Sequence, residues 1–205
     1  DFFRGEGGQS FEFLVNRGEQ HFKLSTDTQN FVPAMQVKGS PENKLFFGYL
    51  NYLTEQRTER TGMTKLLEEL KKDEAANEAK INDLEAEIKK LDEVVIKYQK
   101  DLIQNNPNSF TTSIIKINTP IDIPEEIRKD DIKSFYYYKE HFFDNINMND
   151  ERLVRSPMLI QKLNLFISDK VTVPHPDSTI VAVDKILSLA DEAPEVLRFS
   201  LAHVL

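Results

Sequence analysis

The chain has 205 residues, of which 26 are basic and 34 acidic, so its formal net charge is −8. Because no basic stripe offsets this negative charge, binding to nucleic-acid backbones or anionic lipid is disfavoured, and nucleic acid is not an expected partner. There is no cysteine, so the chain itself can neither form a disulfide nor carry out thiol chemistry.

No apolar run approaches the ~18 residues of a membrane span. Since Asp1 is not an initiator Met and no signal-like region follows, we expect either a removed leader or a cut end there.

The first 39 residues show β-type alternation. Two apolar runs flank NRGEQ, which predicts a hairpin of about residues 10–16 and 20–25 with Gly18 at a positive φ angle. A third extended segment is expected over residues 31–37. GEGG at residues 5–8 is glycine-rich like a phosphate-binding loop, but no strand precedes it and no helix follows it, so we expect a turn or a flexible tip. Because so few strands are marginal alone, further strands are expected upstream of Asp1.

A long helical region follows. GSPEN predicts a helix start, with Ser40 as the N-cap and Pro41 at the first helical position. Further on, apolar residues recur at alternating spacings of three and four, which is typical of a coiled coil; they are Ile81, Leu84, Ile88, Leu91, Val95, Tyr98 and Leu102. We expect a helical hairpin that reverses near residues 73–77. Since no Gly or Pro marks the turn, one continuous helix over 40–104 is the alternative.

Three charged pairs on these arms have the i,i+4 spacing that supports helices: Glu68 with Lys72, Glu85 with Lys89, and Glu93 with Lys97. Such pairs are typical of a solvated face.

The remaining sequence predicts shorter helices. One begins near Ser109, INTPIDIPEEI is an extended linker, and helices follow at about 131–145, 157–168, 177–190 and 194 onward. The last ends without a Gly, an Asn or a polar stop, so we expect the parent protein to continue beyond Leu205.

The predicted fold is therefore mainly α (α+β). A partial β module covers 1–39, a long helical hairpin covers 40–105, and a helical module at 106–205 packs on the hairpin base. Residues 40–205 are expected to form one domain.

The stretch KEHFFDNINMNDERLVRSPML mixes ionisable and aromatic side chains in the manner of an active site. His141 and Asp144 are the nearest pair with ligand spacing, but the stretch lacks HExxH and a second His, so a metal site is not expected. Asn149 is expected instead to cap a short helix through Asp150 and Glu151. We predict no catalytic, cofactor-binding or metal-binding residue. A hydrolase or metalloenzyme that uses His141, Asp144 and Glu151 is the less favoured alternative.

The aromatic run FYYYKEHFF is typical of a helix buried between layers, because its rings fall on several faces. The alternative is a candidate partner or ligand surface, since Tyr hydroxyls need hydrogen-bond partners. That surface would comprise Tyr136, Tyr137, Tyr138, His141 and Phe143.

Four segments occur in a characteristic order: FEFLVNRGEQHFKLSTD, VKGSPENKLFFGYLNYL, YQKDLIQNNPNSF and YYYKEHFFDNINMNDERLVRSPML. Together they resemble the N-terminal part of thioredoxin-like thiol-disulfide oxidoreductases from the cell envelope of anaerobic, Gram-negative gut bacteria. The most specific are GSPEN, QNNPNS, and HFFDN followed by DERLVRSP. In that family a small β module precedes a helical module of unknown function, and the thioredoxin fold comes last.

The resemblance implies an exported protein, periplasmic or lipid-anchored, whose main partner is a thioredoxin-like domain in the same parent chain. Catalysis in that family requires a Cys-x-x-Cys pair. Since this chain has no cysteine, no active-site residue carries over. The implied role is a non-catalytic module that positions the thioredoxin domain, dimerises or binds protein clients. The alternative is a stand-alone helical interaction module with no redox partner.

Overall fold

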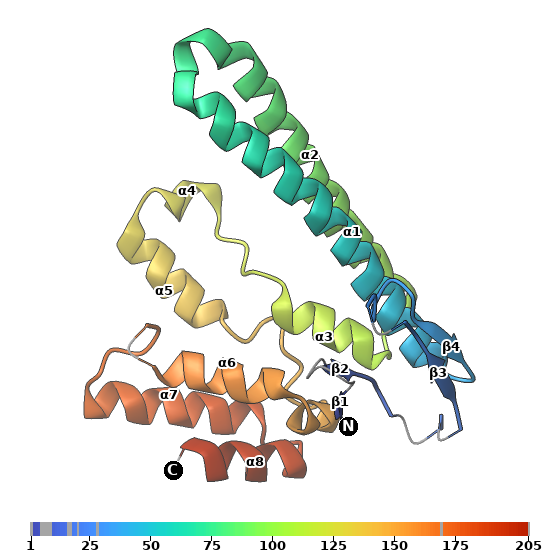
Figure 1. The fold of residues 1–205 in the computed structure, drawn as a ribbon. Helices are drawn as coiled ribbons and strands as arrows, with labels where there is room; N and C mark the ends of the chain where they lie inside the picture. The colour runs from blue at the N-terminus through green and yellow to red at the C-terminus, as the bar shows by residue number, and fades with distance from the viewer. Residues whose placement is uncertain are drawn as a thin grey trace. The chain divides into compact units, whose positions relative to one another are not determined.

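The computed structural model describes residues 2–4, 10–15, 18–19, 21–27, 29–168 and 170–204. The GEGG turn predicted at residues 5–8 lies outside them. The fold is mainly helical with a small β part, as predicted (Figure 1). It divides into two compact units, 1–111 and 112–205, which are described separately below. The domain boundaries expected from the sequence stay a prediction. None of the helices in the described part of the chain is long and apolar enough to span a membrane.

The N-terminal strands form two separate antiparallel pairs. β1 (Phe2–Arg4) pairs with β2 (Ser10–Glu12), and β3 (Lys23–Ser25) pairs with β4 (Gln36–Lys38). The predicted hairpin between residues 10–16 and 20–25 is therefore wrong, because alternation identifies strands but not their partners.

The turns also differ from the prediction. Residues 31–34 form a turn in which Ala34 N donates to Asn30 O at 2.9 Å, so only the end of the predicted segment 31–37 is extended. Among the described residues the positive φ is found at Gly39, at 81°, and not at Gly18. A Cβ atom at Gly39 would lie 2.8 Å from His21 O, so this position needs glycine for space as well as for φ.

The helical hairpin is confirmed. α1 (Pro41–Leu70) and α2 (Glu74–Asn105) are joined by the short 3₁₀ helix η1 (Lys71–Asp73). Asp73 caps α2 by accepting a hydrogen bond from Ala76 N at 3.4 Å, which provides a turn without Gly or Pro. Side-chain contacts along the arms show that they run antiparallel: Tyr49 with Gln99 at 2.9 Å, the Tyr52 and Tyr98 ring centroids at 3.9 Å, Arg60 with Asp92 at 2.9 Å, and Lys71 with Glu85 at 2.7 Å.

The apolar seam between the arms is thin. Of the predicted seam residues, Ile81 and Leu84 are buried, whereas the others are only half-buried. The predicted i,i+4 charge pairs are wrong, since the same side chains find other partners: Lys72 pairs with Glu69, Glu85 with Lys71, and Lys97 with Asp101.

The boundary between the two units falls within α3 (Phe110–Asn118). The helices after it are α4 (Glu125–Arg128), α5 (Asp131–His141), η2 (Glu151–Arg155), α6 (Pro157–Ile167), α7 (Pro176–Leu189) and α8 (Pro194–Val204). α6, α7 and α8 pack together (Figure 1). Their shared core contains Leu159, Leu163, Phe166, Ile186 and Val196, each at most 1% exposed.

Two predicted details of the second unit are wrong. The helix expected at 131–145 ends at His141, because turns at residues 142–145 follow, with Asp144 N bonded to His141 O at 3.0 Å. The cap of η2 is Asp150 and not Asn149, since the Asp150 carboxylate accepts from Arg152 N at 3.2 Å.

Candidate functional site

The GSPEN segment, residues 39–43, joins β4 to α1, and its polar side chains all bond within the first unit. The Ser40 hydroxyl accepts a hydrogen bond from Asn43 N at 3.0 Å, which caps α1, and it donates its own proton to the Glu19 carboxylate. Both Glu19 oxygens also accept from Glu42 N at 3.3 Å. The start of α1 is therefore held by a hydroxyl and a carboxylate, as its partly positive end favours.

Asn43 connects α1 to the chain that follows β2. Its side chain is fully buried, accepts from Leu14 N at 2.7 Å and donates to Leu14 O at 2.6 Å. The same amide nitrogen donates to Ser40 Oγ at 2.8 Å. Asn43 thus satisfies both backbone polar groups of Leu14, as a neighbouring strand would.

Glu42 is buried, and its carboxylate lies at the N-terminus of α3. It accepts from Ser109 Oγ at 2.6 Å, Thr111 Oγ1 at 2.6 Å, Thr111 N at 2.8 Å and Phe110 N at 3.2 Å. Burial by itself would raise the pKa of Glu42, but the hydrogen bonds from Ser109, Thr111 and Phe110 outweigh it and hold that pKa below its ordinary 4.5. The side chain is therefore a charged cap.

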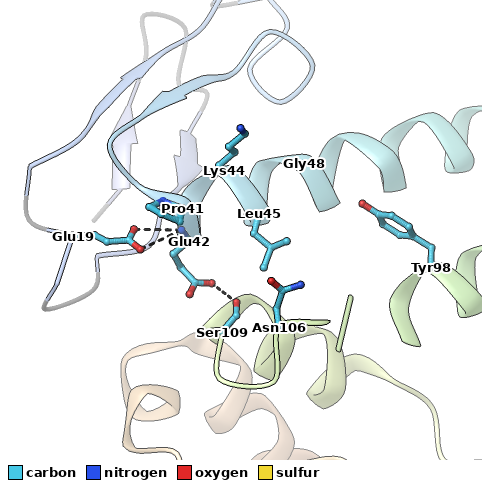
Figure 2. A pocket seen from close by; sticks show the side chains of 9 residues that line it. All are labelled: Glu19, Pro41, Glu42, Lys44, Leu45, Gly48, Tyr98, Asn106 and Ser109. Atoms are coloured by element: carbon cyan, nitrogen blue, oxygen red, sulfur yellow. Dashed lines mark hydrogen bonds between the residues drawn. The ribbon is translucent and has the colours of Figure 1, made fainter. Parts of the chain in front are cut away.

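A groove of about 460 Å³ opens beside these residues, at the base of the hairpin. Figure 2 shows Glu19 and Tyr98 at opposite ends of the row that lines it, with Leu45 and Asn106 between them. Among the described residues the Tyr98 hydroxyl has no hydrogen-bond partner. Burial, with a smaller effect of the neighbouring Tyr52 and Tyr49, raises the pKa of Tyr98, so this hydroxyl is a neutral donor at physiological pH.

The groove contains groups that can bind a ligand, and its Ser109 hydroxyl and Glu42 carboxylate are bonded to each other. Ser109 is its most obvious nucleophile, but its hydroxyl donates to Glu42, and the lowered pKa of Glu42 makes that carboxylate a weak general base. Among the described residues that line the groove there is no His, and the chain has no Cys. The arrangement can therefore offer hydrogen bonds and apolar contact to a ligand.

The predicted candidate surface on α5 is brought together only in part. Tyr136 is 64% exposed, whereas Phe143 is 5% exposed and packs on Phe166 with ring centroids 4.7 Å apart. Phe143 is therefore a core residue in the second unit. Tyr138 makes an edge contact with Phe142 at 5.6 Å. Deep burial begins at Phe142, just after α5 ends, so the expected helix buried between layers is wrong.

His141 has local partners. Its Nδ1 lies 2.6 Å from Asp144 Oδ2. Its ring packs against the Tyr137 ring, with the centroids 4.1 Å apart and the ring planes tilted by 30°. Glu151 instead accepts from Glu195 N at 3.4 Å. Within the described ranges no group of three or more His, Asp or Glu side chains could hold a metal ion. Whether the exposed part of Tyr136, Tyr137, Tyr138 and His141 binds a partner stays a prediction.

The DERLVRSP segment also bonds internally. The Asp150 carboxylate accepts from Ser113 Oγ at 2.8 Å and from Arg152 Nε at 2.7 Å. Burial would raise the pKa of Asp150, but the Arg152 and Ser113 hydrogen bonds lower it overall. The roles of Asp150, Glu42 and Asn43 were missed from the sequence. Their only local signal is that a polar residue caps a helix or lies in its first turn.

A family model described as "Domain of unknown function (DUF5106)" matches residues 95–203, slightly more than half of the chain. That description agrees with the expected helical module of unknown function, and it names neither an activity nor a thioredoxin-like partner. No curated protein and no solved structure matches the chain.

Proposed function

Since the chain belongs to the DUF5106 family, a domain of unknown function, we propose its role from its contacts and from the resemblance described above. It is a non-catalytic N-terminal module of a cell-envelope thioredoxin-like thiol-disulfide oxidoreductase. It positions the redox domain, mediates dimerisation or binds protein clients. The chemistry would be done by cysteines outside this sequence, because it contains none.

One observation carries this proposal: several polar residues of the GSPEN, QNNPNS and DERLVRSP segments are used for structure. Ser40 and Asn43 of GSPEN, Ser109 of QNNPNS and Asp150 of DERLVRSP all bond to nearby backbone or side chains. Catalytic groups need a free lone pair or proton directed at a substrate. Residues fixed in this way support a scaffold and not a reaction.

The proposal includes a location and partners. The parent would be exported to the periplasm or cell envelope of a Gram-negative gut anaerobe, with a lipid anchor as one means of attachment. Its partners would be the thioredoxin-like domain of the same chain, protein clients or a second copy. Support comes from the order of the four resembling segments, and the net charge of −8 argues against nucleic acid.

The gene itself provides the first test. Reading in frame beyond Leu205 should give a thioredoxin-like domain with Cys-x-x-Cys after a strand, and reading upstream of Asp1 should give an export signal. The full-length protein should then reduce a small aromatic disulfide at the same rate whether or not Asn43 is replaced by Ala. Reduction of protein disulfides should fall in that variant. A stop codon directly after Leu205 would refute the proposal.

The second candidate is a stand-alone helical protein-interaction module. It is favoured by large apolar side chains that are exposed on helices of the second unit: Ile132 at 71%, Tyr136 at 64% and Val181 at 66%. Such residues are often contact points for partners. This candidate predicts a gene that encodes no redox domain, so the same reading of the gene separates the two.

A further inference from the structure

The groove at the base of the hairpin has a negatively charged end. Glu19 accepts hydrogen bonds from Ser40 and Glu42 N, and among the described residues it has no basic partner. Lys44 also lines the groove, but in Figure 2 its side chain extends away from Leu45 and Asn106. The charged residues that line the groove are thus Glu19, Glu42 and Lys44, so carboxylates outnumber ammonium groups there.

The rest of the groove mixes apolar and polar groups, Asn106 among them, and ends at a hydroxyl. Leu45 and the bare backbone of Gly48 form part of its wall, and Tyr98 closes the end opposite Glu19 (Figure 2). The Tyr98 hydroxyl is directed toward α1 and lacks a partner within the described part of the chain. The volume of about 460 Å³ is within the range of ~300–1,000 Å³ that is usual for ligand sites.

We propose that this groove binds an extended peptide segment through a lysine or arginine side chain. The charged end of that side chain bonds to Glu19, its aliphatic stem lies over Leu45 and Gly48, and a peptide carbonyl accepts from the Tyr98 hydroxyl. A carboxylate at one end, the wall at Leu45 and Gly48, and a neutral donor at the other end match these three parts in order. The inference rests on the client-binding role proposed above and gives it a chemical class.

Gly48 makes the proposal testable without damage to the core. A Cβ atom at Gly48 would meet no atom within 4 Å, so a larger side chain there extends into the groove. Gly62 is the matched control, because its Cβ also meets nothing within 4 Å. It lies on the same helix, ~21 Å along the axis at 1.5 Å per residue, and outside the groove.

The probes are three capped pentapeptides, Ala-Gly-X-Gly-Ala, in which X is lysine, norleucine or glutamate. Titration of the labelled chain, followed by amide chemical shifts, should give saturable binding of the lysine peptide with shifts at Gly48 and Tyr98. The norleucine peptide, which lacks only the ammonium group, should bind at least tenfold more weakly, and the glutamate peptide should not bind.

The variants locate the site. Gly48→Phe should weaken binding of the lysine peptide at least tenfold, whereas Gly62→Phe should leave it unchanged. Glu19→Gln should remove most of the preference for the lysine peptide over the norleucine peptide. This variant tests the proposal independently if Gly48→Phe fails to fold. Equal binding of all three peptides, or wild-type affinity in a folded Gly48→Phe, would overturn the inference. Since these titrations need no redox domain, their failure is distinguishable from failure of the proposed parent function.

Discussion

The side chain of Asn43 bonds to both backbone polar groups of Leu14, at 2.7 Å from its N and 2.6 Å from its O. Because Asn43 is fully buried, Asn43→Ala would leave these groups without partners and should lower the free energy of unfolding by about 2–3 kcal/mol. Urea unfolding measures this loss, and amide exchange at Leu14 should accelerate. Asn51→Ala is the control, because the side chain of half-buried Asn51 makes a solvent-exposed hydrogen bond to Glu55 at 2.8 Å, and its effect should stay within about 0.5 kcal/mol. Equal losses in both variants would contradict the assignment.

Glu42 should make stability depend on acid pH. Its pKa is lower in the folded chain than its ordinary 4.5, because the hydrogen bonds at the start of α3 outweigh the effect of burial. The unfolded chain therefore binds the proton more tightly, so the stabilisation is present above about pH 4.5 and is lost as pH falls through the lower folded pKa. Glu42→Gln cannot ionise at this position. The stability difference between wild type and Glu42→Gln, from urea midpoints, should be constant at neutral pH and shrink below about pH 4.5. A difference that persists unchanged to pH 3 would count against the cap.

The elements that could be predicted from the sequence are those set by local signals. The starts of α1 and α6 follow from Pro41 and Pro157, since proline at the first helical position lacks only an N–H that would be unpaired there. The reversal at η1 was placed within a few residues because the apolar seam on α2 needs a partner face.

Pairings between distant residues could not be predicted. Glu42 and Thr111 are 69 positions apart, and no spacing rule connects a carboxylate at one helix start with the start of another. The pairing of β2 with β1, and not with β3, could not be predicted either, because alternation of apolar residues does not specify which strand is the partner. Glu85 bonds across the hairpin to Lys71, although Lys89 lies one turn away on its own helix. The groove is lined by residues from distant parts of the sequence, from Glu19 to Ser109, so only its separate residues were visible in the sequence.

Replacement by alanine should change stability in opposite directions at Gly39, which precedes α1, and at Gly48, which lies within it. Gly39 has φ of 81°, and an added Cβ would lie 2.8 Å from His21 O. Gly39→Ala should therefore destabilise the chain by at least about 1–2 kcal/mol. Gly48 is helical with open space around its Cβ position, so Gly48→Ala should stabilise it by about 0.5–1 kcal/mol through helix propensity. Thermal unfolding of both variants checks the opposite signs, and a stabilising Gly39→Ala would show that the loop relaxes without strain.

Two isoleucines on α7 test which face of this helix is core. Ile186 is 0% exposed and packs in the second unit, whereas Ile180 is 59% exposed. Ile186→Ala removes buried methylene groups and leaves a cavity, so it should lower stability by about 2–5 kcal/mol. Ile180→Ala removes side-chain atoms that are mostly in water and replaces a β-branched residue with the best helix former, so its effect should be near zero or slightly stabilising. Urea unfolding of the two variants gives this comparison directly. A large loss at Ile180 would mean that another molecule or a second copy covers this face in solution, and a concentration-dependent midpoint would then be expected.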